Sequence, residues 1–275
     1  MSAPILEVRG LSKRFGGLVA VDALDMSISA GSIHGLIGPN GAGKSTAFDL
    51  ISGLQTPSAG SVLVDGVDIT GSSVQQRVRR GICRTFQTPR LFEKMSVLEL
   101  VMTGCHVHGT MGLWGSTFSV AAKRREEMAM RAQADALLRK VGLADEGGTP
   151  VANLSYGKRR LAEIARALAT RPRILLLDEV ASGLNPVETT RISELIKALA
   201  TDSLTVVVVE HDMPFVMGMC QQLTVLNFGA RIASGRPDEV ARDAGVIEAY
   251  LGTPHAARVP YRDQRKAALA ATKRR

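Results

Sequence analysis

The sequence predicts an α/β fold, with a mostly parallel sheet, an antiparallel β edge and a helical insertion. Short continuous apolar runs at residues 174–177 and 205–209 are typical of strands that are buried on both faces of a parallel sheet. The insertion is predicted by helical periodicity that begins at Ser96. With 275 residues, 45% of them hydrophobic, the chain can bury one large core or two small ones.

The elements before the insertion are expected to form strands, a loop and a helix. Residues 19–37 have the pattern of strands interrupted at Ala30-Gly31, and the glycines that follow lead to a helix opened by Lys44–Thr46. Residues 60–70 alternate apolar and polar side chains around a turn at Asp65-Gly66. This alternation predicts a hairpin at a sheet edge.

The insertion is expected to contain three helices. The first opens with a capping box, Ser96 to Glu99, the second covers about residues 119–141, and the third covers residues 158–169. The apolar, glycine-broken stretch 109–116 is either a contact loop for a partner or a loop folded on its own helices. We therefore expect an α/β core over about 5–94 and 170–252, and a helical subdomain over about 95–169.

Charge and composition restrict the function without deciding it. A net charge of +8 permits nucleic acid, anionic lipid or nucleotide as a partner, but 4% aromatic residues argue against a stacking surface for single-stranded nucleic acid. No apolar run is long enough to span a membrane, and the N-terminus lacks the pattern of a signal peptide. A role at a membrane would therefore be expected on its cytoplasmic side, through partners.

Three minor features have an ordinary explanation, and two of them also have a functional alternative. The basic tail at 256–275 is expected to be solvated, with contact to anionic lipid as the alternative. Three widely spaced cysteines suit a reducing compartment and the role of small apolar fillers. Residues 105–108, Cys-His-Val-His, could suggest a metal site, but a polar helix end explains them more simply.

A phosphate-binding loop is the strongest motif. Residues 38–45 read GPNGAGKS and match G-x-x-x-x-G-K-[ST] between an expected strand and an expected helix. Backbone amides of such a loop surround phosphates, its lysine neutralises them, and its serine hydroxyl binds Mg²⁺. This context predicts a P-loop NTPase with a RecA-like sheet. The expected phosphate-binding residues are Gly38, Pro39, Asn40, Gly41, Ala42, Gly43, Lys44, Ser45 and Thr46.

Charged residues follow two of the expected strands. Asp178-Glu179 follows the run 174–177, and a Glu-His-Asp sequence at 210–212 follows the run 205–209. Ligands of open α/β sheets bind at the carboxyl ends of strands, so both clusters are expected near the phosphate loop. In this arrangement Asp178 would support Mg²⁺ and Glu179 would polarise an attacking water.

A capped helix start narrows the choice among families of P-loop NTPases. Ser155, within Leu-Ser-Tyr-Gly at 154–157, is an expected N-cap, so this helix is a second one that offers free amides to an anion. With the other motifs, it makes residues 5–252 resemble the ABC ATPase family, whose signature is usually Leu-Ser-Gly-Gly-Gln. The resemblance implies that Ser155 and Gly157 contact the ATP of an opposing subunit, and hence a head-to-tail dimer of two ATPase subunits.

The same resemblance implies roles for four further residues. Phe15 resembles the aromatic residue that stacks on adenine, although an ordinary buried strand phenylalanine has the same pattern. Gln87 corresponds to the glutamine that touches Mg²⁺ and water and reports to the membrane subunit. Glu179 corresponds to the general base, and His211 to the histidine that contacts the γ-phosphate. ATP and Mg²⁺ are the implied ligands.

Departures from the family pattern point to a subfamily. Tyr156, Lys158, Val180 and Asn185 replace commoner residues. Leu-Ser-Tyr-Gly, Ser-Gly-Leu-Asn-Pro, Arg-Thr-Phe-Gln and the closing Val-Ile-Glu-Ala-Tyr-Leu-Gly resemble the branched-chain amino acid transport subfamily of the LivG type. Lys158 and Val180 are not expected even there. The resemblance implies an importer ATPase on the cytoplasmic face of the plasma membrane, with two permeases and, indirectly, an extracytoplasmic solute-binding protein.

Three alternatives remain at the level of sequence. An exporter ATPase of the lipopolysaccharide type would share the fold and the closing Tyr-Leu-Gly segment. A soluble ABC protein acting on DNA or ribosomes would suit the positive charge, but such proteins commonly carry two ATPase units or a long coiled coil. A nucleotide-binding regulator without hydrolysis is disfavoured by Glu179 and His211.

Overall fold

The computed structural model describes residues 4–85, 93–108, 120–201 and 203–251. Its strands are β1 (Pro4–Phe15), β2 (Leu18–Ser29), β3 (Ile33–Ile37), β4 (Ala59–Val64), β5 (Val67–Asp68), β6 (Ile82–Arg84), β7 (Ile174–Asp178), β8 (Thr205–Val209), β9 (Gln222–Asn227) and β10 (Ala230–Gly235). Its α-helices are α1 (Lys44–Ser52), α2 (Val74–Arg79), α3 (Val97–Cys105), α4 (Val120–Lys140), α5 (Tyr156–Ala169), α6 (Pro186–Leu199), α7 (Met213–Met219), α8 (Pro237–Val240) and α9 (Ala244–Leu251). Short 3-10 helices are η2 (His106–His108), η4 (Ala144–Glu146) and η5 (Val151–Asn153).

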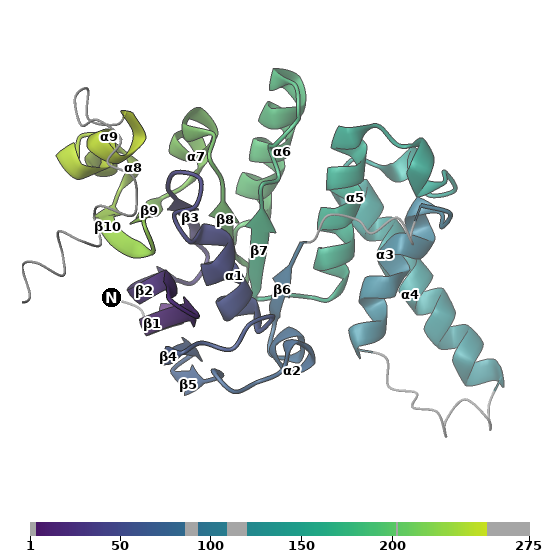
Figure 1. The fold of residues 1–275 in the computed structure, drawn as a ribbon. Helices are drawn as coiled ribbons and strands as arrows, with labels where there is room; N and C mark the ends of the chain where they lie inside the picture. Colours follow the sequence, from purple (N-terminus) through teal and green to yellow (C-terminus); the bar gives the residue numbers. More distant parts are fainter. Residues whose placement is uncertain (1–3, 86–92, 109–119, 202, 252–275) are drawn as a thin grey trace, which may run out of the picture.

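Two sheets form the α/β part of the molecule (Figure 1). The larger has the strand order β10-β9-β3-β8-β7-β6 and is parallel except for the β9–β10 pair. The smaller is antiparallel, in the order β2-β1-β4-β5, and it contains the expected hairpin at its edge. The prediction of a mostly parallel sheet with an antiparallel β edge is therefore confirmed.

The central strands of the larger sheet are buried on both faces. In β7, Ile174 and Leu176 pack toward the smaller sheet and α1, whereas Leu175 and Leu177 pack toward the helices on the other side. The strand β8 alternates in the same way. Continuous apolar runs are therefore required here, because neither face of these strands meets water.

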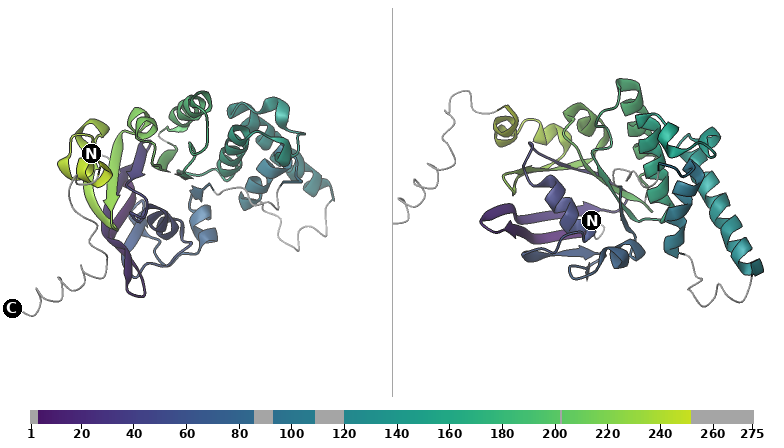
Figure 2. Two further views of the ribbon diagram at one scale, coloured as in Figure 1. Left: turned by 45° about the horizontal axis from the view of Figure 1, so that its top comes forward. Right: turned by 45° about the vertical axis from the view of Figure 1, so that its right-hand side comes forward.

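The helices α3, α4 and α5 pack together beyond β6 (Figures 1 and 2). Helix α3 begins at the expected capping box, in which Ser96 and Glu99 satisfy one another's backbone amides. Helix α5 begins at Tyr156, two residues earlier than expected, because its N-cap is Ser155 and a helix begins directly after its cap. The expected helices of this region are thus present.

One buried arginine holds the end of the helix that follows the phosphate loop. Arg77 of α2 donates from Nη1 to the carbonyl oxygens of Leu50 and Ile51, both at 2.7 Å. These carbonyls lie in the last turn of α1, which has no further helical turn to satisfy them. The side chain of Arg77 therefore fixes α1 from its far end.

The three cysteines are buried and free, as expected for apolar fillers.

Candidate functional site

The loop that joins β3 to α1 requires its glycines. Gly43, the N-cap of α1, has φ of 98°, and a Cβ there would lie 2.3 Å from the carbonyl oxygen of Ala20. Gly38 has φ of 150°, and its Cβ would lie 2.2 Å from the carbonyl oxygen of Leu226. Because neither residue has a side chain, the backbone of this loop can face a ligand directly.

Lys44 points into this loop. Its ammonium group donates hydrogen bonds to the carbonyl oxygens of Gly38 at 2.7 Å and Pro39 at 2.9 Å, and the residue is only 7% exposed. Burial lowers the pKa of Lys44, while the nearby carboxylates of Glu179 and Asp178 act in the opposite direction. The loop therefore holds a largely buried cation beside the first amides of α1, which have no acceptor within the helix, and this environment suits phosphate.

Neighbouring parallel strands bring the expected carboxylates to the same region. Strand β8 lies between β3 and β7, so the carboxyl ends of all three strands lie along one edge of the sheet. Asp178 is the last residue of β7, and Glu179 follows it. The convergence that the sequence predicted is confirmed at the level of topology.

Glu179 has a left-handed backbone, with φ of 47°. This conformation is costly for a residue other than glycine, and such conformations occur preferentially at functional sites. Its amide donates to the carbonyl oxygen of Val209 at 3.0 Å, which ties the residue to the end of β8. The strand β8 therefore helps to set the direction of the Glu179 side chain.

Two charged residues near Asp178 and Glu179 were not assigned roles from the sequence. Arg84 at the end of β6 donates to Asp49 at 2.5 Å and to Asp178 at 2.6 Å, and thereby links α1 to β7. Glu210 is completely buried, and burial raises its pKa although the amides of Ala181 and His211 donate to it. The feature of the sequence that could have indicated Glu210 is its position directly before His211.

His211 follows β8 at the expected strand end. Its side chain is 52% exposed, and its Nδ1 lies 3.7 Å from the Glu210 carboxylate. The next residue, Asp212, caps α7 by accepting from the amide of Phe215. An exposed imidazole at this position can reach a ligand outside the sheet without rearrangement of the buried strand.

A cavity of about 630 Å³ lies beside the phosphate loop. Phe15 at the end of β1 lines it and is 44% exposed, so it is not an ordinary buried strand residue. The cavity also contains Glu179, together with Phe228 and Leu18, which the sequence did not indicate. Its remaining lining residues are Gly17, Val19, Ala20, Asn40, Gly41, Ala42, Gly43, Lys44, Ser45 and Thr46.

Ser155 and Gly157 lie apart from this cavity, at the start of α5 (Figure 1). The Ser155 hydroxyl accepts from the amide of Lys158 at 3.3 Å, and Gly157 packs closely against Glu188 of α6. The unusual Lys158 forms an ion pair with Glu146, and it therefore has a structural partner within its own chain. Gln87, the loop 109–116 and the tail 256–275 fall outside the described residues.

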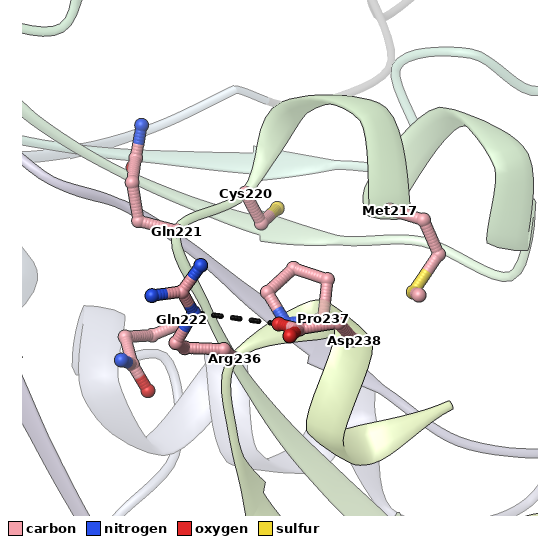
Figure 3. A pocket seen from close by; sticks show the side chains of 7 residues that line it. All are labelled: Met217, Cys220, Gln221, Gln222, Arg236, Pro237 and Asp238. Carbon is pink, nitrogen blue, oxygen red and sulfur yellow. Dashed lines mark hydrogen bonds and ion pairs between the residues drawn. The ribbon is translucent and has the colours of Figure 1, made fainter. Parts of the chain in front are cut away.

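A larger cavity of about 730 Å³ lies elsewhere, near α7, β9 and α8 (Figure 3). Its two charged lining residues, Arg236 and Asp238, form an ion pair at 3.3 Å and offset one another. Its other lining residues are Met217, Cys220, Gln221, Gln222 and Pro237 (Figure 3). We place the candidate site at the phosphate loop instead, because a buried cation, a carboxylate and free amides meet there.

The donor set near the loop fits a hard cation. Ser45 is exposed in the first turn of α1, and the Asp178 carboxylate is close enough to Lys44 to influence its pKa. Hydroxyl and carboxylate oxygens are the protein ligands that Mg²⁺ prefers. One carboxylate oxygen of Asp178 is held by Arg84, so the carboxylate is oriented before any ion binds.

Similarity to known proteins agrees with this geometry. A family model described as "ABC transporter" matches residues 21–182, and one described as "Branched-chain amino acid ATP-binding cassette transporter" matches residues 230–256. The chain is 41% identical to the branched-chain amino acid transport ATP-binding protein BraF of Pseudomonas aeruginosa, over 92% of this chain and 99% of BraF. It is 40% identical to LivG of Escherichia coli K12 over the same shares.

Two further similarities are more distant. The lipopolysaccharide export ATP-binding protein LptB of Escherichia coli K12 is 31% identical, over 90% of this chain and 97% of LptB. A solved ATP-binding cassette of an ABC transporter in its ADP conformation superimposes with a TM-score of 0.81 at 31% identity, covering 92% of this chain and all of that one. Within the described ranges, the structure contains no helix long and apolar enough to cross a membrane. The chain belongs to the ABC transporter family of ATP-binding proteins, in its branched-chain amino acid group.

Proposed function

We propose that this chain is the ATP-hydrolysing subunit of an ABC importer that takes up branched-chain amino acids or similar small solutes. The proposal rests on the buried Lys44 in a glycine loop, near Asp178 and Glu179 at the end of β7 in the same sheet. Such a site binds a nucleoside triphosphate and polarises the water that attacks its γ-phosphate. The greater similarity to BraF and LivG than to LptB favours the importer over the exporter.

In this proposal, each group of the site has a separate task. The loop amides and Lys44 hold the phosphates of ATP, and Phe15 stacks on its base. Ser45, Asp178 and Gln87 hold Mg²⁺, which when bound neutralises charge on the phosphates. Glu179 accepts a proton from the attacking water, and His211 contacts the γ-phosphate.

Ser155 and Gly157 serve the nucleotide of a partner subunit. They begin α5, which lies beyond β6 (Figure 1), and neither residue lines the cavity beside the chain's own phosphate loop. Two ATPase subunits, identical or homologous, would then pair head to tail, close on two ATP molecules and open after hydrolysis. The α/β core would hold the nucleotide, and the helical subdomain would present the start of α5.

The proposed assembly is peripheral to the cytoplasmic face of the plasma membrane. Two permease subunits would form the path for the solute, and an extracytoplasmic binding protein would deliver it. Nucleic acid has no role in this assembly. In such an assembly, solute specificity would belong to the binding protein and the permeases.

Replacement of Glu179 tests the hydrolytic role. In the assembled transporter, Glu179→Gln is expected to lower ATP turnover about 10²- to 10⁴-fold, because the amide cannot accept the proton. Binding of ADP should be retained. Glu194→Gln, which changes an exposed glutamate of α6, is the matched control and should keep wild-type turnover. Wild-type turnover in Glu179→Gln would show that the base is another residue.

The solute is tested separately. The binding protein encoded beside this chain should be titrated by calorimetry with amino acids, amides and urea. We expect heat of binding with an aliphatic amino acid. A response to none of them would exclude the proposed solute and leave the ATPase function intact.

A further inference from the structure

The turn between β9 and β10 presents an aromatic ring to the candidate site. Phe228 is 87% exposed, yet it lines the same cavity as Phe15 and the phosphate loop. Isolated exposed apolar residues are common and need no explanation. This one is different because Phe15 and Leu18, which are 44% and 59% exposed, line the cavity with it.

The backbone of Phe228 is in a conformation that favours other residue types. Asn227 pairs with Ala230, so Phe228 and Gly229 form a two-residue hairpin turn, and their φ values are 46° and 85°. Positive φ at both central positions is the requirement of a type I′ turn, in which asparagine, aspartate or glycine is preferred at the first position. Phenylalanine at this position is strained and gains little from burial.

The turn is fixed to the phosphate loop by its backbone. The amide of Gly229 donates to the carbonyl oxygen of Ala42 at 3.0 Å, and the carbonyl oxygen of Gly229 accepts from Asp22 at 2.9 Å. Ala42 is itself a residue of the phosphate loop. The backbone that carries the Phe228 side chain is therefore held close to the groups that would bind phosphates.

We propose that Phe228 contacts the purine base of the bound nucleotide and, together with Phe15, sets the affinity for that base. The proposal rests on the proposed nucleotide site. The base is the uncharged, planar part of a nucleotide, and its faces stack well on aromatic rings. With the phosphates on the loop, the apolar side chains of Phe15, Leu18 and Phe228 are the part of the same cavity that suits the base.

The decisive variant is Phe228→Asn, measured by calorimetric titration with MgADP. We expect the dissociation constant for ADP to rise about tenfold, the effect of one lost stacking contact. Inorganic tripolyphosphate, which has no base, should bind both proteins equally. Asparagine suits the left-handed turn, so the midpoint of thermal unfolding should stay the same or rise. Weaker binding without loss of stability is a result that general damage to the fold cannot give.

Three further variants complete the experiment. Phe228→Tyr keeps the ring and should bind ADP as the wild type does, and Phe15→Ala should weaken ADP binding. Val67→Asn removes an exposed apolar side chain beside another hairpin turn, outside the cavity, and should change nothing.

Two results would overturn the proposal. The first is wild-type ADP affinity in Phe228→Asn, with or without weaker pairing of two ATPase subunits, which would give the ring a different role. The second is an equal loss of ADP and tripolyphosphate affinity, which would mean that the turn acts on the loop and not on the base. Failure of the wild-type chain to bind ADP at all would instead contradict the proposed function.

Discussion

Two helix starts in this molecule can attract an anion, and they differ in what surrounds them. At α1 the N-cap is Gly43, which has no side chain to satisfy the helix amides. At α5 the N-cap is Ser155, whose hydroxyl already accepts from the amide of Lys158. The first amides of α1 therefore have no capping side chain and can bind a ligand. At α5, one of these amides is already bonded to the cap.

The surroundings sharpen the contrast. The start of α1 lies beside the buried Lys44 and lines a cavity that its own chain forms. The start of α5 is open, and Tyr156 there is about half exposed above Arg160, whose guanidinium lies 5.0 Å from the ring centroid. The start of α1 thus forms a cavity with other groups of its own chain. In the proposed dimer, the start of α5 would add to the nucleotide site of the partner subunit.

The largest expected effect is at the first start. Lys44→Ala should raise the dissociation constant for ADP about 100-fold, because it removes charge-assisted hydrogen bonds to phosphate. Calorimetric titration measures the change. Lys197→Ala, on an exposed part of α6, is the control and should bind ADP normally. Unchanged affinity in Lys44→Ala would contradict the phosphate site at the start of α1.

An effect of similar size, on stability and not on binding, concerns the strand that supports the first start. His34 in β3 is buried, its Nε2 lies 2.9 Å from the Thr224 hydroxyl, and burial lowers its pKa to about 4. Between pH 6.5 and about 4, the unfolded imidazole binds a proton that the folded one does not. The free energy of unfolding should therefore fall as the pH decreases through this window, by roughly 3 kcal/mol.

Urea denaturation at a series of pH values measures this dependence. The variant His34→Gln keeps a hydrogen-bonding side chain but cannot titrate, so its unfolding free energy should change less between pH 6.5 and 4. The same slope in both proteins would assign the pH dependence to other groups.

The smallest effect is expected at the second start. Ser155→Ala removes the cap of α5 and should lower the free energy of unfolding by about 1 kcal/mol. Binding of ADP to the isolated chain should not change, because Ser155 lies outside the chain's own cavity. Turnover in the assembled transporter should fall. Weaker ADP binding by the isolated variant would show that the two starts are not independent.

Much of the fold could be predicted from the sequence because it depends on local patterns of residues. The glycine loop, the apolar runs of β7 and β8 and the capping box at Ser96 each depend on neighbouring residues alone, and each appears where expected. The left-handed conformation of Glu179, the link from Arg84 to Asp178 and the place of Phe228 in the cavity could not be predicted in this way. They depend on residues that are distant in the sequence.

By itself, the sequence determined the chemical groups of this protein and the family to which it belongs, since the motifs are local patterns of neighbouring residues. Only the tertiary structure decided how those groups meet. The parallel order β3-β8-β7 brings the strand ends together, and the hydrogen bonds of Gly229 attach a distant turn to the phosphate loop. The physical reason is that pairing between strands and burial between layers are properties of the whole chain, and no single segment contains them.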